Sequence, residues 1–171
     1  MKMQIKKLKV SVIIVNFNNA IYLAQSINSI LRQTYKSIEI IVVDDKSSDN
    51  SLKILKKYNN KILIVKNKKK TPHGSYNQIN SYYNGFLKSK GDILFFLDSD
   101  DYFKKNKIKT IVKEFKKKKN LDLIFDLPIL KFKNYIIKNK FKQKKFIFSS
   151  WPRFTPQSCI ALKKKICIKS F

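Results

Sequence analysis

Cysteine, glycine and long apolar runs are all scarce in this sequence of 171 residues. The two cysteines, Cys159 and Cys167, form no CxxC pair and have no histidine nearby, so we expect reduced structural thiols. The longest purely aliphatic runs, such as Ile40 to Val43, are far shorter than the roughly 20 apolar residues of a membrane-spanning helix. The basic N-terminus is followed by no apolar segment of signal-peptide length, which predicts a protein kept in the cytoplasm.

Acidic residues are scarce as well: 11 Asp and Glu stand against 38 Lys and Arg, for a net charge of +27. Apolar residues make up 43% of the chain, which predicts a folded domain rather than a disordered polycation. The excess charge leaves two interpretations open, contact with an anionic partner or the codon bias of an AT-rich genome. Lysine is spread over all segments, which favours the second interpretation, and the dense runs 116–119 and 163–165 predict at most peripheral contact with an anionic membrane.

Strand-like runs alternate with helical patterns along the chain. The expected strands are 10–15, 38–43, 62–65 and 93–97, and the expected helices are 20–31, about 48–58 with Ser48 or Asp49 as its cap, 75–87 and 106–117. Strands that are apolar on both faces and separated by helices predict an α/β fold, a mostly parallel sheet with helices on both faces. Beyond residue 120 the segments 121–130, 131–137, 145–150 and 157–162 look like strands or edge segments. No linker interrupts the chain, so 1–171 is expected to be a single domain.

Polar residues gather where three of these strands end. Asparagines follow the first strand and acids follow the second and fourth: Asn16, Asn18 and Asn19; Asp44 and Asp45; Asp98, Asp100 and Asp101. Carboxyl ends of parallel strands are where open α/β sheets bind ligands. Clustered carboxylates repel unless a cation joins them, and their oxygens suit Mg²⁺ or Mn²⁺, which would in turn attract a diphosphate. The alternative is a set of turns and helix caps made by the same side chains.

The order and spacing of these segments resemble a known family. The stretches VSVIIVNFNNAIYLAQSINSILRQTY, IEIIVVDDKSSDNSLKIL and GDILFFLDSDDYF look like the nucleotide-sugar-binding half of family 2 glycosyltransferases, which have the GT-A fold. The resemblance covers about residues 9 to 110. It implies a donor- and metal-binding half over 1–110 and part of an acceptor-side region over 111–171. It also implies an inverting, Mn²⁺- or Mg²⁺-dependent transfer of sugar from a nucleotide-diphosphate donor, usually a UDP-sugar, to a glycan or lipid acceptor.

The resemblance assigns roles to individual residues. It implies that Asp45 accepts a hydrogen bond from the base with support from Asp44, that Asp100 binds the metal directly, and that Asp101 caps the next helix. Asp98 would lie near the ribose and the water shell of the metal. The remaining donor-binding residues that it implies are Val15, Asn16, Phe17 and Asn18 around the base, and Ser99 between the two metal-site acids.

The sequence departs from the family pattern before the fourth strand. Many relatives carry Ala-Arg-Asn-x-Gly where this chain has Ser81-Tyr82-Tyr83-Asn84-Gly85, so the donor-binding arginine is absent. His73 and Gly74, on the preceding loop, are expected to contribute to pyrophosphate binding instead. The alternative for His73 is a solvated surface histidine.

A general base for the acceptor hydroxyl is not identifiable in the sequence. The 45 residues after Asp126 contain no carboxylate, and both Asp122 and Asp126 have the setting of ordinary edge positions. Trp151 and Phe154 are candidates for stacking on a sugar or for core packing. Three explanations stay open: a truncated chain, a base supplied by a partner, or a catalytically silent nucleotide-sugar-binding module. A basic nucleic-acid-binding protein is the rival from another class, but no nucleic-acid-binding motif supports it, so no nucleic-acid partner is expected.

Overall fold

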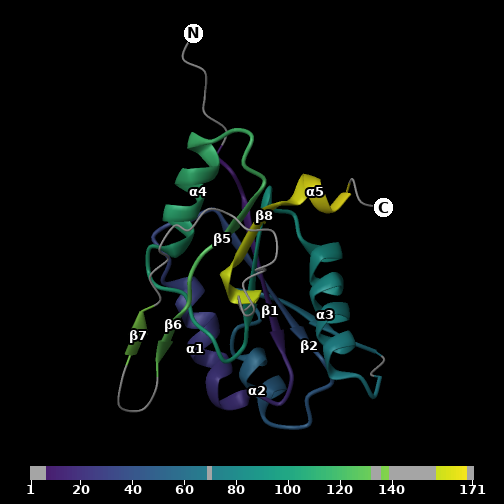
Figure 1. Ribbon diagram of the computed structural model, residues 1–171. Helices are drawn as coiled ribbons and strands as arrows, with labels where there is room; N and C mark the ends of the chain where they lie inside the picture. The colour runs from purple at the N-terminus through teal and green to yellow at the C-terminus, as the bar shows by residue number, and fades with distance from the viewer. Residues whose placement is uncertain (1–6, 69–70, 132–135, 139–156, 169–171) are drawn as a thin grey trace.

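The computed structural model describes residues 7–68, 71–131, 136–138 and 157–168 (Figure 1). Its centre is a six-stranded sheet in the order β3-β2-β1-β4-β8-β5, accompanied by a two-stranded sheet, β6-β7. The strands are β1 (Val10–Asn16), β2 (Ile38–Asp44), β3 (Leu63–Lys66), β4 (Ile93–Asp98), β5 (Leu123–Phe125), β6 (Ile129–Lys131), β7 (Ile136–Lys138) and β8 (Ile160–Lys163). The helices are α1 (Ala20–Leu31), α2 (Ser51–Lys56), α3 (Gly74–Lys88), α4 (Lys107–Lys117) and α5 (Lys164–Ile168), with a 3-10 turn at Gln157–Cys159.

Four neighbouring strands, β3, β2, β1 and β4, run parallel. β1 lies between β2 and β4, and Val15 pairs with Val43 on one side and with Asp98 on the other. All four carboxyl ends therefore meet at the same edge of the sheet. Strand β8 runs antiparallel to both β4 and β5, so the late part of the chain extends the sheet beyond β4. The predicted α/β fold with a mostly parallel sheet is confirmed.

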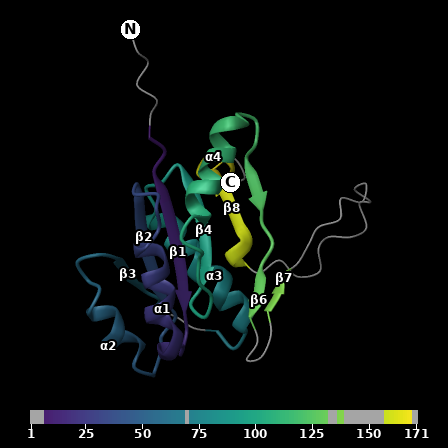
Figure 2. The same cartoon turned by 90° about the vertical axis from the view of Figure 1, so that its left-hand side faces the viewer.

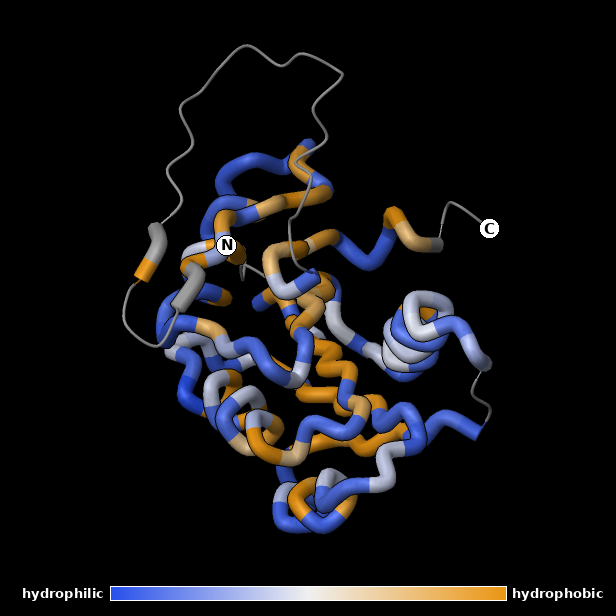
Figure 3. The backbone as a smooth tube through the Cα atoms, turned by 60° about the horizontal axis from the view of Figure 1, so that its bottom comes forward, coloured by the Kyte–Doolittle hydropathy of each residue, from blue (hydrophilic) through white to orange (hydrophobic). Residues whose placement is uncertain are grey.

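The sheet has a helix layer on each face, as predicted (Figure 2). One core joins Val12, Ile14 and Phe95 to the apolar sides of α1, α2 and α4. The opposite core is smaller and joins Ile13 and its neighbours to α3. Successive residues of a strand point to opposite faces, so the uninterrupted apolar run of β1 supplies both cores. The strands accordingly form the main hydrophobic region at the centre of the molecule (Figure 3).

Helix α3 lies unusually close to the sheet. Its buried residues are Asn77, Ser81 and Gly85, which are small or polar. An added Cβ at Gly85 would lie 2.4 Å from Ile13 Cγ2, well inside ordinary contact distance. The small side chains therefore let the helix backbone approach the sheet, and this brings the polar side chains of α3 within reach of the strand ends.

Helix α2 begins later than the sequence predicts. We expected Ser48 or Asp49 to cap it, but the helix starts at Ser51 and Asn50 precedes it without a side-chain capping bond. Asp49 instead accepts hydrogen bonds from the backbone N–H of Ser51 (2.9 Å) and from that of Ala20 (2.9 Å). The Asp49 carboxylate therefore satisfies the first N–H of α2 from one residue before Asn50, and it also joins the start of α1 to this loop.

Asp101 does not cap helix α4, contrary to the prediction. The helix begins at Lys107, and Asp101 sits in a turn in which its N–H donates to the Asp98 carbonyl at 3.0 Å. Between them, Phe103 enters the core and is only 4% exposed. Gln33, from the end of α1, accepts a hydrogen bond from the Ile108 N–H at 3.1 Å and so satisfies a free donor in the first turn of α4.

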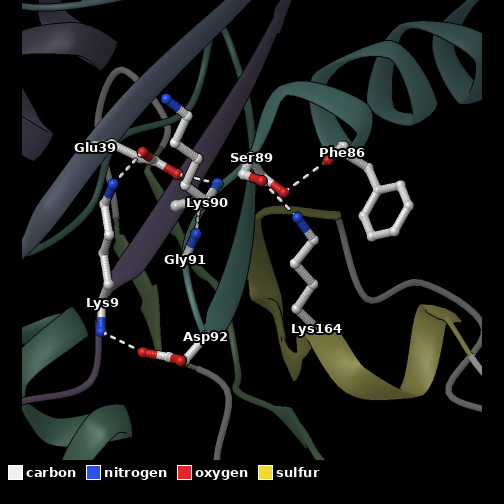
Figure 4. A network of polar contacts seen from close by, with 9 residues as sticks. Lys9, Glu39, Phe86, Ser89, Lys90, Gly91, Asp92 and Lys164 are labelled. Atoms are coloured by element: carbon white, nitrogen blue, oxygen red, sulfur yellow. Dashed lines mark hydrogen bonds and ion pairs between the residues drawn. The ribbon is translucent and has the colours of Figure 1, made fainter. Parts of the chain in front are cut away.

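A polar network fixes the amino-terminal end of the sheet, opposite the strand ends that carry the acids (Figure 4). Glu39 on β2 accepts hydrogen bonds from Ser11 Oγ at 2.5 Å and from the Lys90 N–H, and it pairs with Lys9 Nζ at 2.6 Å. The N–H of Lys9 donates to Asp92 Oδ2 at 2.8 Å. Hydrogen bonds from Lys9, Ser11 and Lys90 outweigh the opposing effect of burial and leave the Glu39 pKa below its usual value. The network joins the starts of β1, β2 and β4.

Some predicted features lie outside the described residues. These are the strand expected at 145–150 and the two candidate stacking residues, Trp151 and Phe154. Among the residues that the structure does describe, no helix has the length and apolar character needed to cross a lipid bilayer. Cys159 and Cys167 are both free thiols, as expected.

Candidate functional site

The carboxyl ends of β1, β2 and β4 and the start of α3 enclose a cavity of about 500 Å³. We call it the strand-end cavity. Seven residues singled out from the sequence line it: Val15, Phe17, Asp45, Gly74, Asp98, Ser99 and Asp100. Four residues that the sequence did not single out complete the lining: Thr71, Pro72, Asn77 and Gln78. The acids that follow β2 and β4 therefore face one shared space, which is what the strand-end argument requires.

Asp45 is held at the floor of this cavity by a buried hydrogen-bonded chain. It is 4% exposed, and Asn67 Nδ2 donates to its Oδ1 at 2.9 Å. Asn67 also donates to Ser81 Oγ at 2.7 Å and accepts from Asn84 Nδ2 at 2.8 Å. One Asp45 oxygen is thereby fixed by the protein itself. Asn67 was missed from the sequence although it follows β3 directly, at the same kind of strand end as the acids.

Three predicted donor-binding residues support the cavity without lining it. Asn16 Nδ2 donates to Asp44 Oδ1 at 3.0 Å, and Asp44 Oδ2 accepts from the Ser47 N–H at 3.0 Å. Asn18 adopts the left-handed conformation (φ 48°), and its Oδ1 accepts from the Ser48 N–H at 2.7 Å. These bonds bind the loops after β1 and β2 to each other, so Asn16, Asn18 and Asp44 set the shape of the rim. Phe17 and Val15 from the same stretch do line the cavity.

Asp98 is held from helix α3. Tyr82 Oη donates to Asp98 Oδ1 at 2.7 Å, and Gln78 Nε2 donates to the same oxygen at 2.9 Å. Burial raises the Asp98 pKa, with the charges of Asp101 and Asp100 adding to it, while the two hydrogen bonds oppose the rise. Burial and the neighbouring Asp98 also raise the pKa of Tyr82, so its phenol stays protonated and acts as a donor. Neither Tyr82 nor Gln78 was a candidate from the sequence.

Ser99 and Asp100, the two residues that follow Asp98, differ in exposure. Ser99 is 4% exposed, and its Oγ accepts a hydrogen bond from Asn19 Nδ2 at 3.1 Å. Asp100 is exposed and lines both the strand-end cavity and a second cavity of about 650 Å³ beside it. Asp100 is the residue that the two cavities share. A ligand bound to it is therefore accessible from both.

The second cavity lies between the 100–111 segment and the segment around β5 and the 3-10 turn. Asp126 lines it and pairs with Lys107 Nζ at 2.7 Å, and that Nζ also donates to the Ser158 carbonyl at 2.8 Å. Asp126 directly follows β5, the edge strand of the sheet, in keeping with the edge position expected for it, and it also faces this cavity next to Asp100. Asp122 is also an edge residue and pairs with Lys163 and Lys165, each at 3.1 Å.

The loop before α3 closes one side of the strand-end cavity. Asn77 Oδ1 accepts from the N–H of Thr71 at 2.9 Å, and its Nδ2 donates to the Thr71 carbonyl at 2.8 Å. These bonds hold Pro72 and Gly74 against the cavity. His73, the residue before the first helical position of α3, is exposed, makes no side-chain capping bond and does not line the cavity. The structure thus places Gly74 at the site and His73 outside it.

The donor set of the strand-end cavity fits a divalent cation of the Mg²⁺ or Mn²⁺ type. Three carboxylates, Asp45, Asp98 and Asp100, line it without any Lys or Arg among the lining residues that the structure describes. Mg²⁺ is usually bound through one or two carboxylates, with waters and phosphate oxygens completing the shell. Within the described part of the chain, no three or more His, Cys, Asp or Glu side chains are grouped closely enough to hold a metal ion together. Asp98 and Asp100 are the residues that would hold such an ion.

Comparisons with known proteins agree on one family. The family model described as glycosyl transferase family 2 matches residues 11–171. An uncharacterized glycosyltransferase of Nostoc is 35% identical over 127 residues, which are 72% of this chain and 38% of that protein. The poly(ribitol-phosphate) beta-N-acetylglucosaminyltransferase TarP of Staphylococcus aureus is 38% identical over 120 residues, 68% of this chain and 35% of that protein.

The solved structures agree with this at the level of the fold. The crystal structure of Staphylococcus aureus TarS residues 1–349 in complex with UDP superimposes with a TM-score of 0.75 at 21% identity, covering 95% of this chain and 49% of that one. The match extends over the late strands, well past residue 110. The chain spans 35% to 38% of the length of the two relatives above.

Proposed function

Because this chain belongs to glycosyl transferase family 2 and has its GT-A fold, we propose that it carries the donor site for sugar transfer from a UDP-type nucleotide sugar to a glycan or lipid acceptor. The observation that carries the proposal is the convergence of Asp45, Asp98 and Asp100 on one cavity from two different strand ends. An isolated turn or helix cap would not require acids that lie 53 and 55 residues apart in the chain, Asp45 against Asp98 and Asp100, to share a space. The UDP bound to the related TarS structure supports the choice of nucleotide.

The roles of the residues follow from their environment. Asp45 has one oxygen fixed by Asn67 and lies on the cavity wall, so its other oxygen is available to accept a hydrogen bond from the N–H of a base such as uracil. Phe17 and Val15 provide an apolar surface next to it. Pro72 and Gly74 form the facing rim. Because Gly74 has no side chain and nothing lies within 4 Å of its Cβ direction, the backbone leaves room there for a bulky ligand.

Asp98 and Asp100 are the proposed ligands of Mn²⁺ or Mg²⁺. When bound, the ion would balance the charge of the diphosphate during the departure of the sugar. Ser99 accepts a hydrogen bond from Asn19, and this bond holds the turn between the two acids in place. The lining residues described are negative or neutral and include no cation, so an anionic diphosphate would meet three carboxylates and no positive side chain in the metal-free cavity. Nucleotide binding should therefore depend on the metal.

The second cavity is the proposed acceptor side. It adjoins the donor cavity at Asp100, so a hydroxyl bound there would lie beside the reacting end of the donor. Tyr102, Phe103 and Pro128 give it an apolar character that suits the ring face of a sugar. Both Asp126 oxygens lie within bonding distance of Lys107 Nζ, at 2.9 Å and 2.7 Å, so this carboxylate is occupied in an ion pair and is not assigned as the general base.

Thermal unfolding with UDP tests the proposal. A ligand present at 100 times its Kd stabilises the folded state by about 2.7 kcal/mol, which raises the Tm of a protein of this size by roughly 5–11 °C. We expect that rise with UDP and Mn²⁺ together and little rise with UDP in EDTA. Asp100→Ala should abolish the metal-dependent rise, whereas Asp101→Ala, one position away and outside the strand-end cavity, should retain it.

Three outcomes would change the conclusion. No rise for the unaltered chain with UDP and either metal would refute a UDP-type donor site. A full rise without any transfer or donor hydrolysis would favour a silent nucleotide-sugar-binding module. Binding that weakens steeply with salt and requires no metal would instead indicate a nucleic-acid-binding protein.

A further inference from the structure

The carboxylate of Asp98 is oriented by two side chains from another segment of the chain. Gln78 and Tyr82 lie four residues apart on α3 and therefore on one face of that helix. Both donate to Asp98 Oδ1, at 2.9 Å and 2.7 Å. Among the described residues Asp98 Oδ2 makes no hydrogen bond, and Asp98 lines the cavity. One oxygen is thus fixed and the other is left for a ligand.

Both donors are neutral, and this matters for a carboxylate that holds a cation. A Lys or Arg at hydrogen-bond distance would neutralise Asp98 and compete with a metal ion for it. A phenol and an amide fix the orientation of the carboxylate while leaving its charge in place.

We propose that Tyr82 and Gln78 are positioning residues that fix Asp98 for binding of the divalent metal and the donor diphosphate. The proposal rests on the function proposed above. Tyr82 is the informative member of the pair, because it does not line the cavity and acts on a ligand only through Asp98. Gln78 lines the cavity and is within reach of a ligand itself.

The hydroxyl of Tyr82 can be removed without disturbing its ring. The ring packs edge-on against Phe96 with centroids 5.2 Å apart, and a phenylalanine retains that contact. Tyr82→Phe therefore removes one hydrogen bond to a charged group and little else. Tyr76 lies on the same helix, is 60% exposed and stays outside the cavity, so Tyr76→Phe is the matched control for loss of a tyrosine hydroxyl.

The experiment is a calorimetric titration of UDP into each variant of the full chain, in saturating Mn²⁺ and in EDTA. A hydrogen bond to a charged group supports a change of about tenfold in affinity. We expect Tyr82→Phe to reduce the metal-dependent gain in UDP affinity about tenfold, with UDP binding in EDTA close to that of the unaltered chain. Tyr76→Phe should change neither. Since both donors share one oxygen, Tyr82→Phe with Gln78→Met should lose more than the product of the two single losses.

The outcomes separate this inference from the proposed function. If the unaltered chain binds UDP with Mn²⁺ and Tyr82→Phe binds it equally well, the positioning role is refuted while the donor site stands. An equal loss in Mn²⁺ and in EDTA would show general damage to the pocket and would also refute it. If the unaltered chain binds no metal–UDP, the proposed function and this inference fail together.

Discussion

The three glycines of the chain provide a graded test of how the sheet and α3 are packed. Gly91 is the least tolerant position, because a Cβ there would lie 2.5 Å from both the backbone N and the Oγ of Ser11 and 2.8 Å from the Val10 carbonyl carbon, and backbone atoms cannot move aside as a side chain can. Ordinary contacts need about 3.5 Å or more, so Gly91→Ala forces the start of β4 away from β1 by about 1 Å. The shift also breaks the bond from the Gly91 N–H to Ser11 Oγ, which measures 2.8 Å.

The cost of Gly91→Ala can be estimated from these contacts. Overpacking a core position costs about 1–3 kcal/mol, and the lost hydrogen bond costs about 1 kcal/mol. A total of about 3 kcal/mol lowers the Tm of a protein of this size by roughly 6–12 °C. Gly85→Ala should cost less, because the clash at 2.4 Å with Ile13 Cγ2 is partly offset by about 1 kcal/mol of improved helix propensity.

Gly74→Ala is the matched control, since nothing lies within 4 Å of its added Cβ. The assay is thermal unfolding followed by circular dichroism, repeated as urea unfolding so that free energies are compared at one temperature. The expected order of destabilisation is position 91, then 85, then 74. A Gly91→Ala Tm within about 2 °C of the unaltered chain, or an order with position 74 first, would refute the close packing of β4 on β1 described here.

Three further predictions concern ionisable groups. The pKa of Glu39 is lowered in the folded state, so its contribution to stability is present above the usual glutamate pKa and is lost as the pH falls through the folded value. In urea unfolding, the free energy of unfolding should therefore fall less on acidification for Glu39→Gln than for the unaltered chain. Lys107→Met leaves Asp126 without its partner at 2.7 Å and should reduce the unfolding free energy by about 1–3 kcal/mol. The double variant Lys107→Met with Asp126→Leu should recover part of that loss, because no unpaired charge remains. Equal losses in the two variants would contradict the ion pair. Burial, together with the charge of Asp126, raises the pKa of Cys159 to about 12. Alkylation of this thiol at neutral pH, measured by mass spectrometry, should therefore be slow in the folded protein and fast in urea. Rapid labelling before unfolding would contradict the burial of Cys159.

The sequence was sufficient to predict the first four strands, because each contains an unbroken run of four or five apolar residues. Helix α1 has the predicted bounds, since apolar residues recur at every third or fourth position between Ala20 and Leu31. The shared cavity of Asp45, Asp98 and Asp100 followed from the rule that parallel strands end at the same edge. These features depend on patterns that are local in the sequence, or on a rule that links parallel strands.

The supporting residues were not predictable in the same way. Tyr82 and Gln78 look like ordinary polar positions of a helix, and their partner Asp98 lies 16 and 20 residues further along the chain. The start of α4 was misjudged because Gln33, 75 residues before Ile108, supplies the bond that an adjacent cap would make. Asn67 did have a signal, since it stands directly after β3, and the strand-end rule applied to that strand would have selected it.

The position of β8 between β4 and β5 has a consequence for how the chain is made. β4 is an apolar strand whose outer edge pairs with β8, from Ile93 with Lys163 to Phe95 with Ala161. At 5–20 residues per second, a ribosome needs roughly 3–13 s to pass from the end of β4 to the end of β8. Throughout that interval the outer edge of β4 in the nascent chain has unpaired backbone groups, which could pair with a neighbouring polypeptide. Synthesis of this protein is thus expected to depend on chaperones that shield a half-built sheet.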